Sequence, residues 1–153
     1  MRKLTIYTDG AIQQSCKLGG WAAVILESNQ SSYAIAGREI NTTSNRMELQ
    51  AVIEALNEAS ERCDMSITEI EVISDSQYVV HGASDWLQKW KLNNWKGAGG
   101  KVKNRDLWES LDSYIQKSKI KFTWVKGHNG LLYNEICDKL AVAQYVELDK
   151  EVD

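Results

Sequence analysis

The sequence predicts a mixed α/β domain in which three antiparallel strands precede strands that helices connect. Two observations lead to this prediction. Strand-like segments follow one another closely at the start of the chain, and helical spacing of apolar residues then alternates with two further strand-like segments. The chain has 153 residues, a length typical of one domain. We assign this domain to residues 1–146 and an acidic tail to residues 147–153.

Five segments have the composition of strands. Lys3–Asp9 alternates apolar residues with threonines, whereas Trp21–Glu27 is almost continuously apolar and follows a turn signal at Gly19 and Gly20. The first three segments are close enough for an antiparallel meander. The other three predicted strands are Ser32–Glu39, Glu69–Asp75 and Ile120–Val125.

Apolar residues recur at helical spacing between these strands. The first helix is predicted to follow Asn41–Asn45, a segment rich in residues that favour helix N-caps. Asn45 and Glu48 have the spacing of a capping box, which gives Glu48 a structural interpretation beside any functional one. The other predicted helices are Gln77–His81, Asp85–Lys91, Arg105–Lys117 and Tyr133–Val146.

Composition and charge exclude several classes of protein. The longest apolar run, Trp21–Leu26, is far shorter than the roughly 20 residues of a membrane helix, and the first residues lack an apolar signal-peptide segment. Cys16, Cys63 and Cys137 form no CxxC motif, so we interpret them as reduced thiols. We therefore expect a cytoplasmic protein without a membrane partner.

A basic segment lies within this acidic protein, whose net charge is −3. Lys89–Arg105 contains lysines and arginine but no acidic residue. Such a patch can bind phosphates on a protein that is negatively charged as a whole, because salt screens charges more than about 8–10 Å away. Trp86, Trp90 and Trp95 interleave with its lysines, a pattern that suits nucleic-acid binding. The spacing of Trp86 and Trp90 equally fits a helix packed on the core.

Four acidic residues are candidates for a metal site. Asp9 and Asp75 end two predicted strands, and ligands gather beyond the carboxyl ends of strands in α/β sheets. Glu48 lies near the start of a helix, and Asp138 lies beside apolar residues of the last helix, where a carboxylate needs a partner. Each also fits a cap or a solvated surface, and spacing alone does not show that the four meet.

Five segments around these residues resemble the motifs of the type-I ribonuclease H family, typified by bacterial ribonuclease H. The resemblance covers about residues 3–145 and implies a ribonuclease H-like α/β fold, with a five-stranded mixed sheet in the order 3-2-1-4-5 and flanking helices. It also implies an endonuclease that hydrolyses the RNA strand of RNA·DNA hybrids and leaves 5′-phosphate and 3′-hydroxyl ends. The segments are TDGA (8–11), TTSNRMEL (42–49), SDSQYV (74–79), WVKGHNG (124–130) and NEICDKLA (134–141).

The resemblance implies the catalytic residues as well. Asp9, Glu48, Asp75 and Asp138 match the metal-binding carboxylates of the family, and His128 matches its catalytic histidine. Two divalent ions would activate water and stabilise the leaving oxygen, with Asp9 bridging both. We expect Mg²⁺, with Mn²⁺ as a substitute, because hard cations prefer oxygen ligands.

The substrate contacts follow from the same resemblance. Asn45 and Gln77, with the backbone near Gly10, are expected to recognise the 2′-hydroxyl, since amides both donate and accept hydrogen bonds. Thr43 and Asn104 are expected to hold a DNA-strand phosphate, with Arg46 nearby, and the basic segment resembles the basic protrusion of bacterial members. The residues expected to bind substrate are Gly10, Thr43, Ser44, Asn45, Arg46, Gln77, Trp86, Trp90, Lys91, Lys96 and Asn104. The expected partner is the hybrid alone, bound by a monomer.

The chain departs from the family pattern at several positions. Ser44 stands where asparagine is usual, Asn41 stands where a basic residue is common, and the expected loop Ala11–Leu18 lacks the usual Pro/Gly-rich pattern. Two other functions remain open: a resolvase- or integrase-like nuclease of the same superfold, and a catalytically silent hybrid-binding module. The presence of all four carboxylates argues against the silent module.

Overall fold

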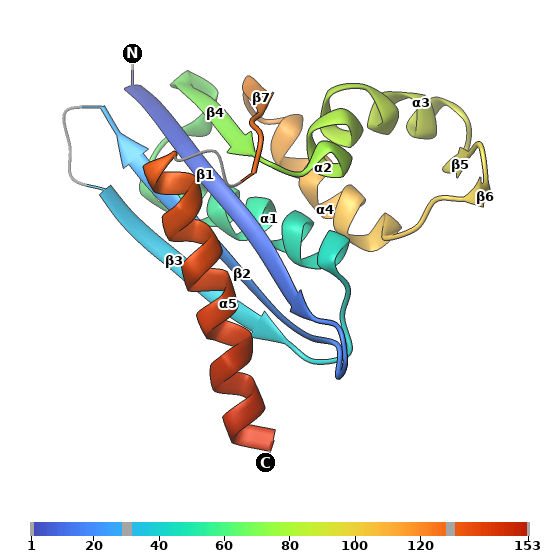
Figure 1. The fold of residues 1–153 in the computed structure, drawn as a ribbon. Coiled ribbons are helices and arrows are strands. Elements are labelled where there is room, and N and C mark those ends of the chain that lie inside the picture. The colour runs from blue at the N-terminus through green and yellow to red at the C-terminus, as the bar shows by residue number, and fades with distance from the viewer. Residues whose placement is uncertain (1, 29–31, 128–130, 153) are drawn as a thin grey trace.

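The computed structural model describes residues 2–28, 32–127 and 131–152, and its centre is a five-stranded mixed sheet (Figure 1). The strand order is β3-β2-β1-β4-β7; the first three are antiparallel neighbours, and β4 and β7 run parallel to β1. The predicted order is therefore confirmed. The strands are β1 (Arg2–Gln13), β2 (Leu18–Glu27), β3 (Ser32–Glu39), β4 (Thr68–Ser74) and β7 (Ile120–Trp124).

Helices cover both faces of this sheet (Figure 1). On one face α5 packs on β1, β2 and β3, and on the other α1 packs on β1 and β2 and is itself contacted by α4. None of the helices in the described ranges is long and apolar enough to cross a bilayer. The helices are α1 (Ser44–Arg62), η1 (Met65–Ile67), α2 (Gln77–His81), η2 (Gly82–Trp86), α3 (Leu87–Leu92), α4 (Arg105–Ile115) and α5 (Leu132–Val152).

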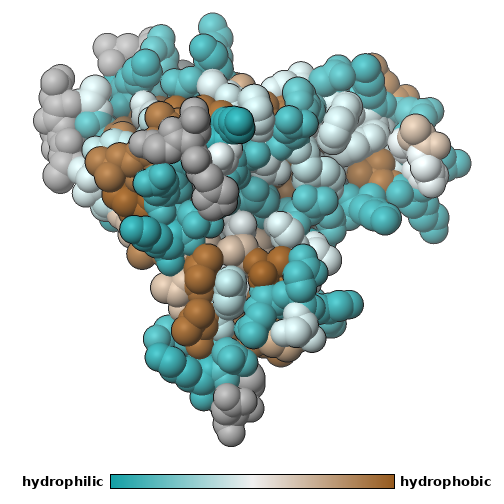
Figure 2. Space-filling model, viewed as in Figure 1, coloured by the Kyte–Doolittle hydropathy of each residue, from teal (hydrophilic) through white to brown (hydrophobic). Residues whose placement is uncertain are grey.

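The position of β2 explains its almost continuously apolar sequence. Ala23 and Ile25 lie in the core on the α1 side, whereas Ala22 and Val24 pack on the α5 side. Because successive strand residues point to opposite faces, a strand covered on both faces is apolar throughout. The outer surface on the α5 side is mainly hydrophilic, with hydrophobic atoms emerging along α5, where Val146 is 41% exposed (Figure 2).

The segment after β4 is helical almost without interruption. The predicted helix Gln77–His81 is confirmed as α2, and the π-helical turn η2 joins it to α3. Within η2, Gly82 lies against Trp108, and a Cβ on Gly82 would come within 2.2 Å of the indole ring. The two helices that were predicted separately therefore form one continuous helical segment. The turn between them packs on Trp108.

A small hairpin projects from the body of the molecule beyond α3 (Figure 1). Its strands β5 (Lys96–Gly97) and β6 (Gly100–Lys101) place Lys96 directly opposite Lys101. The residue before it, Trp95, has a left-handed backbone with φ 60. The sequence pattern did not predict this hairpin, since strands of two residues show no alternation.

The first hairpin of the main sheet corrects the expected loop Ala11–Leu18. The antiparallel ladder of β1 and β2 continues as far as the pair Gln13 and Leu18, so only the residues between them form the turn. The Lys17 N–H donates to the Gln13 carbonyl at 2.9 Å, and Lys17 has φ 55. Both β1 and β2 are therefore longer than predicted, because the tight turn between them is not visible in the spacing of apolar residues.

Two helix ends also differ from the prediction. The N-cap of α1 is Thr43, whose hydroxyl accepts the Arg46 N–H at 3.2 Å, and Asn45 lies inside the helix. The capping-box interpretation of Glu48 was therefore wrong. The last helix is longer than predicted, because α5 continues to Val152 through most of the segment assigned to an acidic tail.

Candidate active site

Asp9 and Asp75 lie where two adjacent parallel strands stop pairing. The ladder between β1 and β4 ends at Thr8 and Ser74, and each aspartate follows directly. Asp9 is 4% exposed and Asp75 is half-buried. One carboxylate oxygen from each of Asp9, Glu48 and Asp75 lies within 4.8 Å of the others. The structure therefore brings three of the four predicted carboxylates together where β1 and β4 stop pairing.

Glu48 reaches this edge from the second turn of α1, because β1 and α1 approach closely at Gly10. A Cβ on Gly10 would lie 2.5 Å from the backbone nitrogen of Glu48, so this approach requires glycine. Glu48 is 8% exposed, and its Oε1 is buried without a hydrogen-bond partner among the described residues. A carboxylate oxygen in that situation costs free energy, which a bound cation would recover.

Contacts from the end of β7 fix Asp75. The indole N–H of Trp124 donates to the Asp75 carbonyl at 3.1 Å, and the Val125 N–H donates to the Ser74 carbonyl at 3.0 Å. Gly127 then passes the Asp75 side chain so closely that a Cβ would lie 2.9 Å from Oδ2. His128, the expected catalytic histidine, lies outside the described residues.

Asp138 approaches from α5, on the opposite face of the sheet from α1. The Cys137 thiol donates to the Tyr7 carbonyl at 3.2 Å, and the rings of Tyr7 and Tyr133 are 5.4 Å apart, which seats this helix on β1. Asp138 is half-buried and is not part of the oxygen group that the other three form within the described ranges. Its negative charge nevertheless contributes to the raised pKa of Asp9, so it acts on the same site.

Burial and mutual repulsion make the cluster retain protons. Burial, followed by the charge of Asp75, raises the pKa of Asp9 to about 7. Burial, followed by the charges of Asp9 and Asp75, raises the pKa of Glu48 well above its ordinary value. A divalent cation would relieve this repulsion, and carboxylate oxygens are the donors that hard cations prefer. The residues present therefore fit a divalent metal site.

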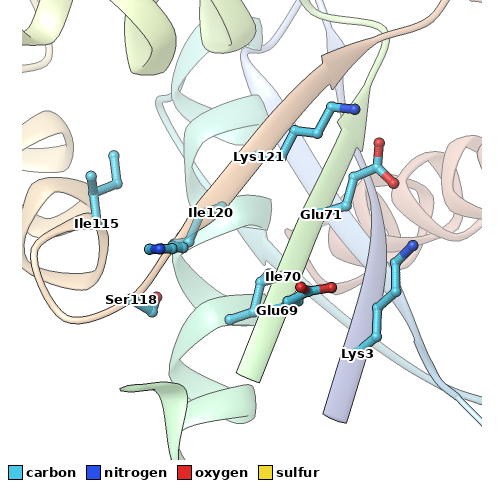
Figure 3. Close-up of a pocket in the computed structure, with 9 residues that line it drawn as sticks. Lys3, Glu69, Ile70, Glu71, Ile115, Ser118, Ile120 and Lys121 are labelled. Carbon is cyan, nitrogen blue, oxygen red and sulfur yellow. The ribbon is translucent and has the colours of Figure 1, made fainter. Parts of the chain in front are cut away.

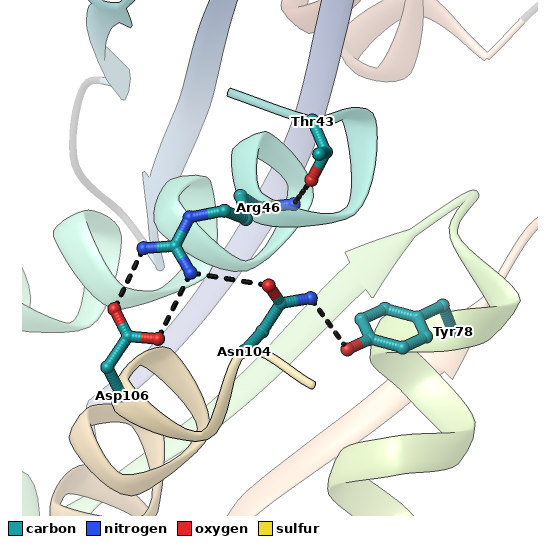
Figure 4. Close-up of polar contacts among 5 residues, drawn as sticks. All are labelled: Thr43, Arg46, Tyr78, Asn104 and Asp106. Carbon is teal, nitrogen blue, oxygen red and sulfur yellow. Dashed lines mark hydrogen bonds and ion pairs between the residues drawn. The ribbon is translucent and has the colours of Figure 1, made fainter. Parts of the chain in front are cut away.

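The expected DNA-strand contacts lie together at the starts of α1 and α4 (Figure 4). Arg46 donates from Nη1 to Asn104 Oδ1 at 3.3 Å, and its guanidinium forms two further hydrogen bonds to Asp106, at 3.0 and 2.8 Å. Thr43 is joined to the same group through the Arg46 backbone. Sequence reasoning missed Asp106, whose only signal is an acidic residue in the first turn of a helix.

The expected readers of the 2′-hydroxyl lie close in sequence to Glu48 and Asp75. Ser44 and Asn45 are exposed just before Glu48 on α1, and Gln77 is exposed two residues after Asp75. Both helices begin at this part of the molecule and contact each other. Their side chains are thus free to meet a substrate, and their role as readers stays a prediction.

Tryptophans from three helices form a chain of ring contacts. The rings of Trp86 and Trp90 are 6.1 Å apart, and those of Trp90 and Trp108 are 5.3 Å apart. Trp108 is fully buried, Trp90 is half-buried against the core, and Trp86 is 36% exposed. The packing interpretation therefore holds for Trp90, while Trp86 presents part of its ring to solvent.

The two lysines expected to bind substrate differ in their surroundings. Lys91 forms an ion pair with Asp112 at 3.0 Å and is partly buried. Lys96 is exposed on the hairpin, opposite Lys101. Like charges placed directly opposite destabilise a hairpin, so the positive charge there needs an explanation beyond folding.

A hollow of about 590 Å³ lies at the opposite edge of the sheet (Figure 3). Residues from the amino-terminal ends of β1, β4 and β7 line it, together with the end of α4 and the segment that follows. The carboxylates lie where β1 and β4 stop pairing, toward the carboxyl end of β4, and none of them lines this hollow, which is therefore separate from the candidate site. Its lining residues are Lys3, Glu69, Ile70, Glu71, Ile115, Ser118, Lys119, Ile120 and Lys121.

Known proteins resemble this chain over almost its whole length. The family model described as RNase H matches residues 1–145. The chain is 48% identical over 141 residues to ribonuclease HI of Haemophilus influenzae, covering 92% of this chain and 88% of that protein. It is 46% identical over 144 residues to a ribonuclease H of Actinobacillus pleuropneumoniae, covering 94% and 90%.

Solved structures share the fold. LC9-RNase H1, a type 1 RNase H with the type 2 active-site motif, superposes with a TM-score of 0.85 at 24% identity, over 96% of this chain and 74% of that one. LC11-RNase H1, solved in complex with an RNA/DNA hybrid, gives a TM-score of 0.74 at 19% identity, over 98% and 99%. The fold, the carboxylate cluster and the sequence matches agree: this chain belongs to the ribonuclease H family.

Proposed function

We propose that this chain hydrolyses the RNA strand of RNA·DNA hybrids and leaves 5′-phosphate and 3′-hydroxyl ends. The supporting observation is the convergence of Asp9, Glu48 and Asp75, whose oxygens lie within 4.8 Å of one another where the parallel pairing of β1 and β4 ends. Relatives 46% and 48% identical are named ribonucleases H, and a structure of similar fold was solved with an RNA/DNA hybrid.

Two Mg²⁺ ions, bound together with the substrate, are the proposed cofactors, and Mn²⁺ is a proposed substitute. Asp9, Glu48 and Asp75 would hold them, with Asp138 adding a ligand from α5. Bound divalent ions would supply an activated water and stabilise the leaving oxygen. The protein contributes buried oxygen donors whose raised pKa values favour the exchange of protons for metal charge. His128 would assist proton transfer, since histidine changes charge near neutral pH.

The choice of RNA over DNA requires groups that recognise the 2′-hydroxyl. We assign this role to Asn45 and Gln77, with Ser44 supplying a hydroxyl where relatives carry a second amide. Their exposure beside the carboxylates supports this assignment. The Gly10 N–H donates to Asp9 Oδ1 at 2.9 Å, so the backbone at this position also holds the metal ligand.

The DNA strand would lie across the group formed by Thr43, Arg46 and Asn104. This surface would extend along η2, α3 and the projecting hairpin through Trp86, Lys91 and Lys96, while Trp90 supports Trp86 from the core side. Positive charge binds phosphates without regard to sequence, and an exposed indole stacks on a sugar or base.

A substrate panel tests the proposal. Labelled RNA·DNA hybrid, DNA duplex and RNA duplex are incubated with the protein in Mg²⁺ and, separately, in EDTA. We expect cleavage of the RNA strand of the hybrid alone, abolished by EDTA. Cleavage of the DNA duplex would favour a resolvase- or integrase-like nuclease instead. Hybrid binding without cleavage would favour a silent binding module.

We further propose that the chain acts as a monomer in the cytoplasm, without an obligate protein partner. Cys16, Cys63 and Cys137 are free thiols, in agreement with a reducing compartment. Light scattering during size-exclusion chromatography of the free protein should give the mass of one chain, 17.3 kDa. A dimer mass for the free protein would contradict this assignment.

A further inference from the structure

We propose that Tyr78 is a positioning residue for the DNA-strand phosphate site and acts through the side chain of Asn104. This inference rests on the proposed function, because it takes Arg46 and Asn104 as contacts of that phosphate. The phenol oxygen of Tyr78 accepts the Asn104 Nδ2–H at 3.1 Å, as Figure 4 shows, and the indole N–H of Trp108 at 2.9 Å. One hydroxyl therefore joins α2 to two residues at the start of α4.

The side-chain amide of Asn104 bridges Tyr78 and Arg46. With Nδ2 directed to the phenol, Oδ1 faces Arg46 and accepts its Nη1 hydrogen at 3.3 Å. An amide turned by 180° would direct Nδ2 at the guanidinium of Arg46, which has only donors, and the bond to Arg46 would be lost. Asp106 binds the guanidinium as well, so Asn104 and Asp106 together set the orientation of Arg46 (Figure 4).

The amide of Asn104 is not used to cap its own helix. Asn104 precedes α4 with a left-handed backbone, φ 60 and ψ 30, and its side chain makes no capping hydrogen bond. Asparagine at such a position ordinarily caps the helix with its side-chain oxygen. Here both ends of the amide instead hydrogen-bond to Tyr78 and Arg46. We infer that Asn104 serves to connect these two residues.

Tyr78 is held firmly enough to act as a reference point. Its ring lies 5.4 Å from the ring of the fully buried Trp108 and 6.3 Å from the ring of Trp86. From this fixed group the hydrogen bonds lead outward to Arg46, whose side chain is 34% exposed. A cation that is already oriented loses less conformational entropy when it binds a phosphate.

The position of Tyr78 in α2 also links the two strands of the proposed substrate. Gln77, the neighbouring residue, is assigned to the 2′-hydroxyl of the RNA strand, whereas Tyr78 orients the group assigned to the DNA strand. One short helix would therefore align both contacts.

Tyr78→Phe tests the inference, because it removes one oxygen and keeps the ring. The matched control is Tyr114→Phe, since Tyr114 is also half-buried and its hydroxyl donates to Asn57 Oδ1 at 3.0 Å between α4 and α1. We expect Tyr78→Phe to raise KM for the hybrid, and Kd measured in EDTA, roughly three- to tenfold, with kcat changed less than about twofold. Tyr114→Phe should leave all three values unchanged.

A double-mutant comparison shows whether Tyr78 acts through Asn104. Asn104→Ala should raise KM, and adding Tyr78→Phe to it should have little further effect, because neighbours in one network are not additive. Independent, multiplying effects would overturn the inference. If the wild-type protein cleaves hybrids but Tyr78→Phe has the same KM and Kd as Tyr114→Phe, the inference is also overturned. A wild-type protein without hybrid cleavage would instead contradict the proposed function itself.

NMR of the unmodified, metal-free protein tests the same contact without relying on any variant. The side-chain NH₂ signals of Asn104 should be well separated from those of exposed amides and should exchange slowly with solvent. They should remain so when hybrid is added in EDTA. Signals typical of a freely exposed asparagine amide would overturn the inference.

Discussion

Asp9 concentrates the chemistry of this protein at the scale of single residues. It is buried, it lies beside Glu48 and Asp75, and burial with the charge of Asp75 raises its pKa to about 7. Close spacing and burial suit the binding of a metal ion, but without the ion they make the charged form of these carboxylates unfavourable. Stability and activity should therefore respond in opposite directions when these charges are removed.

Asp9→Asn should lower hybrid cleavage by about 10³-fold or more, since several kcal/mol of transition-state stabilisation depend on the metal site. The metal-free variant should be more stable by about 1–2 kcal/mol, or roughly 2–8 °C in Tm, because one repelling charge is gone. Glu48→Gln should behave similarly. Glu61→Gln, an exposed change on the same helix α1, is the control and should alter neither value. Retained cleavage by Asp9→Asn would remove Asp9 from the site.

The pH dependence of the metal-free protein follows from the same residue. Because the pKa of folded Asp9 is about 7 and its ordinary value is 3.8, the folded state holds more protons than the unfolded state between these values. Stability should fall as pH rises through this window, by at most about 1.4 kcal/mol per unit for one proton. Glu48 shifts in the same direction.

Urea unfolding in EDTA at pH 5 and pH 8 measures this slope. Wild-type protein should be less stable at pH 8, Asp9→Asn should show a shallower change, and Mg²⁺ should stabilise the wild type more at pH 8 than at pH 5. Equal wild-type stability at both pH values would contradict the raised pKa.

At the scale of elements, the site depends on how closely α5 lies on the sheet. Gly20 of β2 faces this helix, and a Cβ there would lie 1.9 Å from the Ala141 carbonyl oxygen. Asp138 lies one turn before Ala141 on α5. The distance between the helix and the strand therefore sets the distance from Asp138 to the other carboxylates.

Gly20→Ala should displace α5 and destabilise the protein by about 1–3 kcal/mol, as expected for overpacking. It should also weaken metal binding, because Asp138 moves with its helix. Gly99→Ala is the matched control, since a Cβ at Gly99 meets no atom within 4 Å. Calorimetry with and without Mg²⁺ measures both effects. A Gly20→Ala protein with wild-type Tm would show that the two elements separate freely.

The elements also show what sequence patterns reveal and what they miss. The strands were predictable from local alternation, and the strand order and the four carboxylates from the resemblance of short motifs to those of the family. The turn η2 and the orientation of Asn104 were not, since they depend on Trp108 and Tyr78, which are brought there by the fold. The two bonds from Arg46 to Asp106 have the same origin, as they join residues from α1 and α4.

At the scale of the whole molecule, charges of opposite sign are separated. The acidic cluster of Asp9, Glu48 and Asp75 lies where the pairing of β1 with β4 stops, and the projecting hairpin places Lys96 opposite Lys101 on a protein whose net charge is −3. A polyanion would therefore be bound by the hairpin and cut at the cluster. Affinity for the hybrid should depend on this separation and not on net charge.

The double variant Lys96→Ala/Lys101→Ala should bind the hybrid more weakly and with a smaller salt dependence. Each lost phosphate contact lowers the slope of log K against log salt by roughly 0.9. Lys119→Ala/Lys121→Ala makes the same charge change at the opposite edge of the sheet and serves as the control. Fluorescence anisotropy in EDTA between about 50 and 200 mM salt gives both slopes. Equal slopes for the two variants would exclude the hairpin from binding.

Asp9 belongs to β1, which has hydrogen-bonded neighbours on both sides from Leu4 to Thr8. Amide hydrogens in such a strand exchange with solvent only when most of the protein unfolds. Local unfolding of β1 therefore cannot move Asp9 away from the other carboxylates. The repulsion between the carboxylates therefore persists in the folded, metal-free protein, and binding of a divalent ion would relieve it.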